Sequence, residues 1–169
     1  MIEIRKARVE DVAGICKVCS DGWRHTYQGI ETPAHIDAVI QEFYNEERVT
    51  KEVTEINDGW NGYYVALEDG KVLGAGGGGC YGEATSELYV IYLDPTRKRE
   101  GIGSRLLQAI TADQVARGAK EQWVSVTQGN AMGIPFYEAV GFEFVEERPD
   151  YFDPENGKPS LRYKRKIGG

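Results

Sequence analysis

Apolar side chains in the first third of the chain recur with the spacing of amphipathic helices. Residues 2–7 alternate and predict a first strand, and then apolar positions return every three or four residues. The first of these stripes consists of Val12, Ile15, Cys16, Cys19 and Trp23. The second consists of Ile36, Val39, Ile40, Phe43 and Tyr44. Thr32-Pro33 precedes the second stripe as an N-cap followed by a first-turn proline. Val49, Val53 and Ile56 continue the pattern, either as an extension of this helix or as a separate short helix.

The middle of the chain changes to the pattern of strands. Residues 62–68 and 71–80 flank Asp69-Gly70, a dipeptide typical of tight hairpin turns. Residues 86–93 are a third apolar and β-branched run. The second of these strands contains four consecutive glycines, residues 76–79. Glycine weakens a strand interior, so the run indicates either a bulge or the close approach of another backbone or ligand, or else a bent and loosely packed strand.

The final part of the chain alternates helices with strands. A helix is expected over residues 102–117, with Gly118 placed to cap it, and a second, short helix ends before Gly141. Strands are expected at residues 123–127, 142–147 and 161–167, the last two joined by a polar loop at 149–159. The whole order, β-α-α-β-β-β-α-β-α-β-β, contains no repeat or linker. It predicts one α/β domain over residues 1–169, with a mixed sheet flanked by helices.

Size and charge narrow the class of protein. The 169 residues are enough for one domain with a buried core. The net charge of −7 makes nucleic acid an unfavourable partner and would attract a cationic small substrate. The apolar runs are too short to span a membrane, and residues 1–5 lack the profile of a signal peptide. We therefore expect a cytoplasmic protein that acts on neither nucleic acid nor membranes.

Cysteine and histidine indicate no metal site. Cys16 and Cys19 form a Cys-x-x-Cys pair, but no further ligands follow at the spacing of a zinc site, and the pair falls on a helix stripe. We interpret both as small core residues, and the three cysteines of the chain do not suggest a disulfide framework. His25 and His35 have no partner at metal-binding or catalytic spacing, and we interpret them as surface or capping residues.

The turn between the strand at residues 86–93 and the helix at 102–117 has the properties of an anion site. Gly101 and Gly103 allow the backbone to turn sharply, and the first amides of the helix are unpaired and lie at the positive end of its dipole. Four of the nine residues from 97 to 105 are basic. A dinucleotide fingerprint would need a third glycine where Leu106 stands, and the Gly-Lys-Ser/Thr of a nucleoside-triphosphate loop is absent. The turn therefore predicts a phosphate-bearing ligand of another kind.

Two motifs resemble those of one known family. Lys98-x-x-Gly101-x-Gly103 resembles the Gln/Arg-x-x-Gly-x-Gly/Ala signature of the GNAT superfamily of N-acetyltransferases, with Lys98 in place of the usual Gln or Arg. Lysine neutralises phosphate without a bidentate fork. Asn130 and Phe136-Tyr137-Glu138-Ala139-Val140-Gly141-Phe142 are similar to the second motif of the family. Gly133 and Pro135 fall where the family more often has helix formers, so we expect the short helix to begin near Pro135.

The resemblance implies a fold and an activity over nearly the whole chain. The fold would be a mixed, mostly antiparallel sheet of about seven strands with helices on both faces. The activity would be direct transfer of the acetyl group of acetyl-CoA to a primary amine in a ternary complex. The acceptor would be a small amine metabolite or drug, which the acidic charge favours, or a protein N-terminus or lysine. A non-catalytic acetyl-CoA sensor module is the alternative to an enzyme.

The resemblance also implies which residues hold acetyl-CoA. The pyrophosphate would lie on the turn formed by Lys98, Arg99, Glu100, Gly101, Ile102, Gly103 and Ser104. The backbone of Ile91, Tyr92 and Leu93 would pair with the pantetheine arm in the manner of a strand. Asn130 would contact that arm or order the neighbouring strand, and its alternative role is a helix cap.

Two residues are candidates for proton transfer. Tyr137 matches the family position that donates to the sulfur of the leaving group, and the alternative is a core tyrosine with its hydroxyl paired to backbone. Glu87 opens an apolar strand at the position where the histone-modifying branch has its general base. The alternatives for Glu87 are a solvated strand end, with the base elsewhere or replaced by a chain of water molecules. A backbone amide late in the strand at residues 86–93 would stabilise the developing oxyanion.

The acceptor is expected at residues 22–29, between the first two helices, because the family shapes its substrate pocket there. Trp23 and Tyr27 are the candidate substrate contacts, with core packing as the alternative for Trp23. Basic residues alternate with apolar ones in the strand at 161–167. We interpret this strand as half-exposed, with its basic side chains in solvent. The alternative is that the strand forms a homodimer contact.

Overall fold

The computed structural model describes residues 1–97, 99–150, 154–155 and 157–168. The helical elements are the 3-10 turn Val9–Asp11 and the helices α1 Val12–Tyr27, α2 Pro33–Phe43, α3 Glu46–Thr54, α4 Ile102–Ala116 and α5 Gly133–Ala139. The strands are β1 Glu3–Lys6, β2 Tyr63–Glu68, β3 Lys71–Tyr81, β4 Thr85–Leu93, β5 Glu121–Thr127, β6 Glu143–Arg148 and β7 Ser160–Lys166. No helix among these described ranges is long and apolar enough to cross a membrane.

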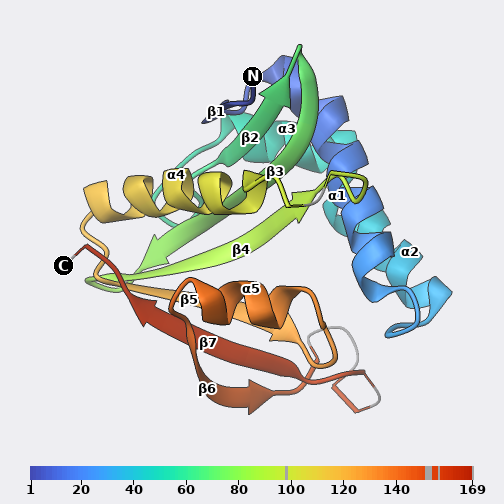
Figure 1. Ribbon diagram of the computed structural model, residues 1–169, viewed down its shortest axis with the longest axis vertical. Coiled ribbons are helices and arrows are strands. Elements are labelled where there is room, and N and C mark those ends of the chain that lie inside the picture. The colour runs from blue at the N-terminus through green and yellow to red at the C-terminus, as the bar shows by residue number, and fades with distance from the viewer. Residues whose placement is uncertain (98, 151–153, 156, 169) are drawn as a thin grey trace.

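The strands form one sheet in the order β1-β2-β3-β4-β5-β7-β6. Every neighbouring pair is antiparallel except β4 and β5, which run parallel. Helices α4 and α5 cover one face, and α1 and α3 cover the other (Figure 1). The expected mixed, mostly antiparallel sheet with helices on both faces is therefore confirmed.

Each face of the sheet has its own apolar core. On one face Ile15 and Cys19 of α1 pack with Val49 of α3 against β2 and β3. On the other face Leu107 and Ile110 of α4 pack with residues of α5, β4, β5 and β7. Most residues of the helix stripes read from the sequence are thus buried or half-buried, but Ile56 lies beyond the end of α3 and is exposed. Cys19 is buried and Cys16 half-buried, as expected of core residues.

Local turn and cap signals act as the sequence predicts. The side chain of Thr32 accepts a hydrogen bond from the backbone of His35 at the start of α2, with Pro33 in the first turn. Asp69 and Gly70 both have positive φ in the β2–β3 hairpin, and Gly118 has positive φ after α4. These conformations depend on the residues themselves and their close neighbours, because glycine and Asp tolerate left-handed backbone.

The glycine run of β3 lies where other backbone approaches it closely. A Cβ at Gly78 would lie 2.0 Å from the carbonyl oxygen of Glu87, and a Cβ at Gly79 would lie 1.9 Å from that of Gly59. The register of β3 and β4 shifts between Gly77 and Gly78, so that Tyr89 is the extra residue of a bulge in β4. The run therefore marks a bulge and a close backbone approach, and the packing around it is tight.

Strands β4 and β5 separate halfway along their length. Their pairing runs from Thr85 opposite Glu121 to Leu88 opposite Val124, and β4 continues without β5 as a partner from Tyr89 to Leu93. On the side of β4 that faces β5, the separation leaves backbone groups without a neighbouring strand at the centre of the sheet (Figure 1), while the other side still pairs with β3. Such groups need a partner, so an extended ligand can complete the pairing here.

Two boundaries differ from the prediction. Helix α1 continues through Tyr27, so most of residues 22–29, expected between the first two helices, lie in its last turns. The stripe of α1 continues to Tyr27, which is buried four residues after Trp23, although polar residues intervene. Helix α5 begins at Gly133 rather than near Pro135. Pro135 is tolerated because it occupies the first turn, where the backbone amides have no partner within the helix.

Candidate active site

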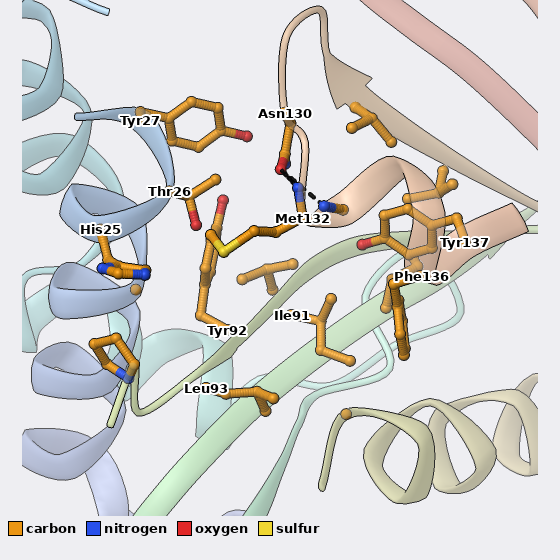
Figure 2. A pocket seen from close by; sticks show the side chains of 18 of the residues that line it. His25, Thr26, Tyr27, Ile91, Tyr92, Leu93, Asn130, Met132, Phe136 and Tyr137 are labelled. Atoms are coloured by element: carbon orange, nitrogen blue, oxygen red, sulfur yellow. Dashed lines mark hydrogen bonds between the residues drawn. The ribbon is translucent and has the colours of Figure 1, made fainter. Parts of the chain in front are cut away.

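A cavity of about 320 Å³ occupies the gap between β4 and β5 (Figure 2). Its floor is the part of β4 from Leu88 to Leu93, and its walls come from Val124 to Val126 of β5, the end of α1 and the start of α5. It also reaches Arg97, Arg99 and Gly103 at the turn before α4. One cavity therefore connects the unpaired edge of β4 with the amide-rich turn.

The turn before α4 has the backbone of an anion cradle. Arg99 and Gly101 have positive φ values of 62° and 74°, and left-handed residues of this kind occur in the backbone turns that bind anions. Arg97 is held by ion pairs to Glu68 at 3.0 Å and to Glu100 at 2.7 Å. The predicted contacts Glu100, Gly101, Ile102 and Ser104 lie in this turn and the first turn of α4, and Lys98 lies outside the described residues. The turn fits a pyrophosphate group by its amides and its cations.

Gly103 keeps the start of α4 close to the cavity. A Cβ at this position would meet side-chain atoms of Leu93 and Phe136 at 3.5 Å, which is ordinary van der Waals contact. A methyl group therefore fits here, and a longer side chain would enter the space between the turn and α5. Ile91, Tyr92 and Leu93, the predicted pantetheine contacts, all line the cavity in Figure 2.

Asn130 lies at the start of α5 and in the wall of the cavity. Its Oδ1 accepts hydrogen bonds from the backbone of Met132 at 3.2 Å and of Gly133 at 2.8 Å, drawn dashed in Figure 2. Asn130 thus caps the start of α5. Its side chain is buried and also lines the cavity. The capping bonds fix how the amide is presented to a ligand.

Tyr137 lies on α5 with its hydroxyl pointing toward the cavity (Figure 2). Its ring is buried and packs edge-to-face on Phe136 and Phe142, with centroids 5.3 Å and 5.5 Å away. Burial, with a smaller effect of Tyr27, raises the pKa of this phenol well above its usual value. Tyr137 therefore keeps its proton at neutral pH and can act as a hydrogen-bond donor.

Glu87 lies beside the cavity and is held by partners of its own. Its carboxylate forms a bidentate pair with Arg162, at 2.6 Å and 3.2 Å, and accepts a hydrogen bond from the hydroxyl of Tyr81 at 3.1 Å. The side chain of Glu87 is 12% exposed, so it is not a solvated strand end. Arg162 also donates to Ser125 at 2.7 Å, and Ser125 lines the cavity. Glu87 is thus connected to the cavity through Arg162 and Ser125.

The two aromatic residues predicted for the acceptor are in different positions. Tyr27 lines the cavity, whereas Trp23 lies behind it and packs on Tyr27 and Tyr92 with ring centroids at 4.3 Å and 5.7 Å. Trp23 thus contacts two lining residues without lining the cavity itself, and it is half-buried.

Two lining residues, Ser125 and Met132, were not singled out in the sequence. His25 and Thr26 belong to the segment expected to hold the acceptor, and Phe136 belongs to the second motif, but none of the three was assigned a contact. His25, interpreted as a surface residue, is exposed and also lines the cavity from the end of α1. No periodicity indicates such residues, because they come from separate elements and share only the cavity.

Comparison with known proteins places the chain in a family. The model of the Acetyltransferase (GNAT) family matches residues 23–142. The chain is 28% identical over 148 residues to a spermidine N(1)-acetyltransferase of Thermoplasma acidophilum, covering 84% of this chain and 88% of the relative. It is 34% identical over 76 residues to the ribosomal protein bS18-alanine N-acetyltransferase of Escherichia coli, covering 45% of this chain and 50% of the relative.

A solved structure resembles the whole chain. The PaiA N-acetyltransferase of Thermoplasma acidophilum in complex with coenzyme A superposes with a TM-score of 0.85, at 25% identity and with 99% of both chains covered. The similarity therefore covers almost the whole chain.

Proposed function

The chain belongs to the acetyltransferase (GNAT) family, and we propose that it acetylates a primary amine of a small polycationic acceptor such as a polyamine. The enzyme class, an N-acetyltransferase, and the donor, acetyl-CoA, follow from the family and its relatives. The observation that carries the assignment of the site is the single cavity that joins the turn before α4 to the unpaired edge of β4. The net charge of −7 and the similarity to a spermidine acetyltransferase support a cationic acceptor.

The residues of the site divide into two groups for acetyl-CoA. The amides of residues 99–104 and the predicted contact Lys98 would hold the pyrophosphate. The backbone of residues 91–93 and the amide of Asn130 would hold the pantetheine arm in the gap between β4 and β5. Acetyl-CoA supplies an acetyl group already activated as a thioester. An amide of the unpaired part of β4 would donate to the acetyl oxygen as it gains negative charge.

Proton movement would use Tyr137 and Glu87 differently. Tyr137 would donate a hydrogen bond to the sulfur as it leaves. Glu87 would take the proton of the attacking amine through water, because its oxygens already accept from Arg162 and Tyr81. Free alkyl amines are mostly protonated at neutral pH, with a pKa of about 10 like lysine, so removal of this proton is a required step.

Calorimetric titration with acetyl-CoA tests the cradle. We expect micromolar binding to the wild type and none to Gly103→Glu, because the longer acidic side chain would fill the space beside Phe136 and repel phosphate. Gly103→Ala is the matched control and should bind like the wild type, since its methyl group makes only ordinary contacts. If Gly103→Glu binds acetyl-CoA as tightly as the wild type, the pyrophosphate does not bind at this turn.

A protein N-terminus is the second candidate acceptor, because the bS18-alanine acetyltransferase is a relative over half its length. Incubation with labelled acetyl-CoA and separate pools of polyamines and of proteins distinguishes the two. We expect the label in the polyamine pool. Label in the protein pool alone would contradict a polyamine acceptor and support a protein acceptor.

A further inference from the structure

A second cavity lies on the face of the sheet that carries α1 and α3. Its volume is about 350 Å³. Aromatic rings form most of its wall, namely those of Phe43, Tyr44, Trp60, Tyr63 and Tyr89. The only carboxylate among its described lining residues is that of Glu52, on α3. An aromatic box around one carboxylate is suited to an organic cation.

Glu52 has one carboxylate oxygen without a partner. Its Oε1 is buried and accepts no hydrogen bond from the residues that the structure describes. Its Oε2 lies 3.6 Å from Nε of Arg48, and burial raises the pKa of the carboxyl above its usual value. Burying a carboxylate oxygen without a donor is unfavourable, so a ligand with N–H donors and positive charge would relieve it.

The backbone holds Glu52 in place. Nε1 of Trp60 donates to the carbonyl oxygen of Glu52 at 2.6 Å, which joins the end of α3 to the wall of the cavity. The ring of Trp60 lies in turn over β3, at the position of Gly77. The backbone of Glu52 is therefore fixed to the wall of the cavity that its side chain lines.

The cavity already receives one cation at its edge. The guanidinium of Arg48 lies over the ring of Phe43 at 4.2 Å while it approaches Glu52. The side chain of Arg48 is 40% exposed, so it can turn outward to solvent. Its position shows that a flat cation fits between an aromatic face and this carboxylate. An anion is disfavoured, because it would face a buried carboxylate oxygen.

The second cavity adjoins the candidate active site. Tyr89 and Val90 line both cavities. Tyr89 is the extra residue of the β4 bulge, which lies at the end of the β4–β5 pairing. The two cavities therefore share part of one wall, formed by two neighbouring residues of β4. A flexible molecule with an amino group at each end would have to pass beside these two residues to place one end in each cavity.

We propose that the Glu52 cavity binds the protonated amino group at the far end of a polyamine whose near amine is acetylated between β4 and β5. This assignment rests on the function proposed above and adds the group that selects a diamine over a monoamine. The far ammonium would donate to Oε1 of Glu52 and lie against the rings of Trp60 and Tyr89.

Steady-state kinetics with matched acceptors tests the cavity. The probes are α,ω-diaminoalkanes from putrescine upward and the alkylamines of the same lengths. In Glu52→Gln we expect KM for the best diamine to rise about tenfold or more, as for a lost charged hydrogen bond, with kcat and the monoamine KM little changed. Glu47→Gln, an exposed glutamate of the same helix, should behave like the wild type. A diamine KM that Glu52→Gln leaves unchanged, or an equal rise for both amines, would overturn the proposal.

Direct binding separates this proposal from the proposed function. Trp60 lines the cavity, so diamine should change the tryptophan fluorescence of the wild type, and the change should be lost in Glu52→Gln and in Trp60→Phe. Saturable binding that depends on Glu52, with no acetylation of any amine, would support the cation site and contradict the proposed acetylation of polyamines. Acetylation of diamines that does not depend on Glu52 would support the proposed function and contradict the cation site. Melting temperatures of all variants exclude a loss of folding as the cause.

Discussion

The phenol of Tyr137 illustrates how burial sets the role of a single residue. Burial raises the pKa of this phenol, whereas a thiol like that of cysteine has a pKa of about 8.5. A phenol that holds its proton more tightly than the thiol does would transfer it unfavourably. Tyr137 is therefore suited to donate a hydrogen bond to the sulfur as it becomes a thiolate, and full proton transfer can follow from solvent.

Replacing Tyr137 by phenylalanine tests this role. We expect kcat to fall about tenfold or more, because the leaving sulfur loses its donor. The KM for acetyl-CoA and the melting temperature should change little, since the phenylalanine ring keeps the edge-to-face contacts with Phe136 and Phe142. Steady-state kinetics at saturating substrates measures the effect. An unchanged kcat would assign Tyr137 to packing alone.

At the scale of the elements, the glycine run of β3 determines how closely neighbouring backbone can approach. The loop at residues 57–61 runs along this strand, and the backbone of Asn61 donates to the carbonyl oxygen of Gly78 at 2.8 Å. On the other side, β4 forms its bulge opposite Gly77 and Gly78. A side chain on Gly77 or Gly78 would push the loop at residues 57–61 and β4 away from β3. This would displace Trp60, which lies in the loop, and the bulge at Tyr89, which lies in β4.

Gly79→Ala should destabilise the fold through this contact. The added Cβ would lie 1.9 Å from the carbonyl oxygen of Gly59, so the loop has to move. We expect the free energy of unfolding to fall by about 1–3 kcal/mol, the range of overpacked sites. Urea denaturation measures it, with Gly103→Ala as the control that should lose no stability. A Gly79→Ala variant as stable as the wild type would mean that the loop yields freely.

The sequence predicted the seven strands and most helices, with boundaries that differ by a few residues, but it left open whether α3 is a separate helix and missed the 3-10 turn Val9–Asp11. Two boundary errors fall at the ends of elements that face the cavity. Helix α1 runs on to Tyr27, which is buried four residues after Trp23, but polar His25 and Thr26 lie between them because they line the cavity. Helix α5 starts at Gly133 because Asn130 caps it there, a contact between side chain and backbone that residue type alone left open.

At the scale of the whole molecule, Asp113 of α4 joins distant parts of the fold. Its carboxylate accepts from Lys6 of β1 and from Tyr64 of β2, both at 3.0 Å, and from Arg117 at 2.9 Å. Arg117 also donates to Asp58 in the loop beside β3. Burial alone raises the pKa of Asp113, but these hydrogen bonds outweigh it and hold the pKa below its usual value.

The depressed pKa of Asp113 predicts how stability depends on pH. A carboxyl with a lower pKa in the folded than in the unfolded state contributes stability above the unfolded value of about 3.9, and this stability is lost as pH falls through the folded pKa. We expect the unfolding free energy of the wild type to decrease steadily below about pH 5. In Asp113→Asn the value at neutral pH should be lower and the decrease with acid smaller.

Urea denaturation across the acid range measures this dependence. Asp69→Asn, at an exposed turn position, is the matched control and should keep the slope of the wild type. An Asp113→Asn variant with the full acid dependence would assign that dependence to other carboxyls, such as that of Asp11. Burial also raises the pKa of Asp11, but hydrogen bonds from Arg5 and the backbone of Arg8 lower it below its usual value.

The sequence by itself determined the features that depend on near neighbours in the chain. These include the helix stripes, the hairpin at Asp69-Gly70 and the turn at Gly101, because backbone conformation and amphipathic faces follow from residues within a few positions. The tertiary structure alone decided which side chains meet across the sheet. Glu87 meets Arg162, which is 75 positions away, only because β5 lies between β4 and β7. Likewise, Glu52 and Tyr89 line one cavity although they lie on different elements, α3 and β4. No pattern of neighbouring residues in the sequence predicts that they lie close together.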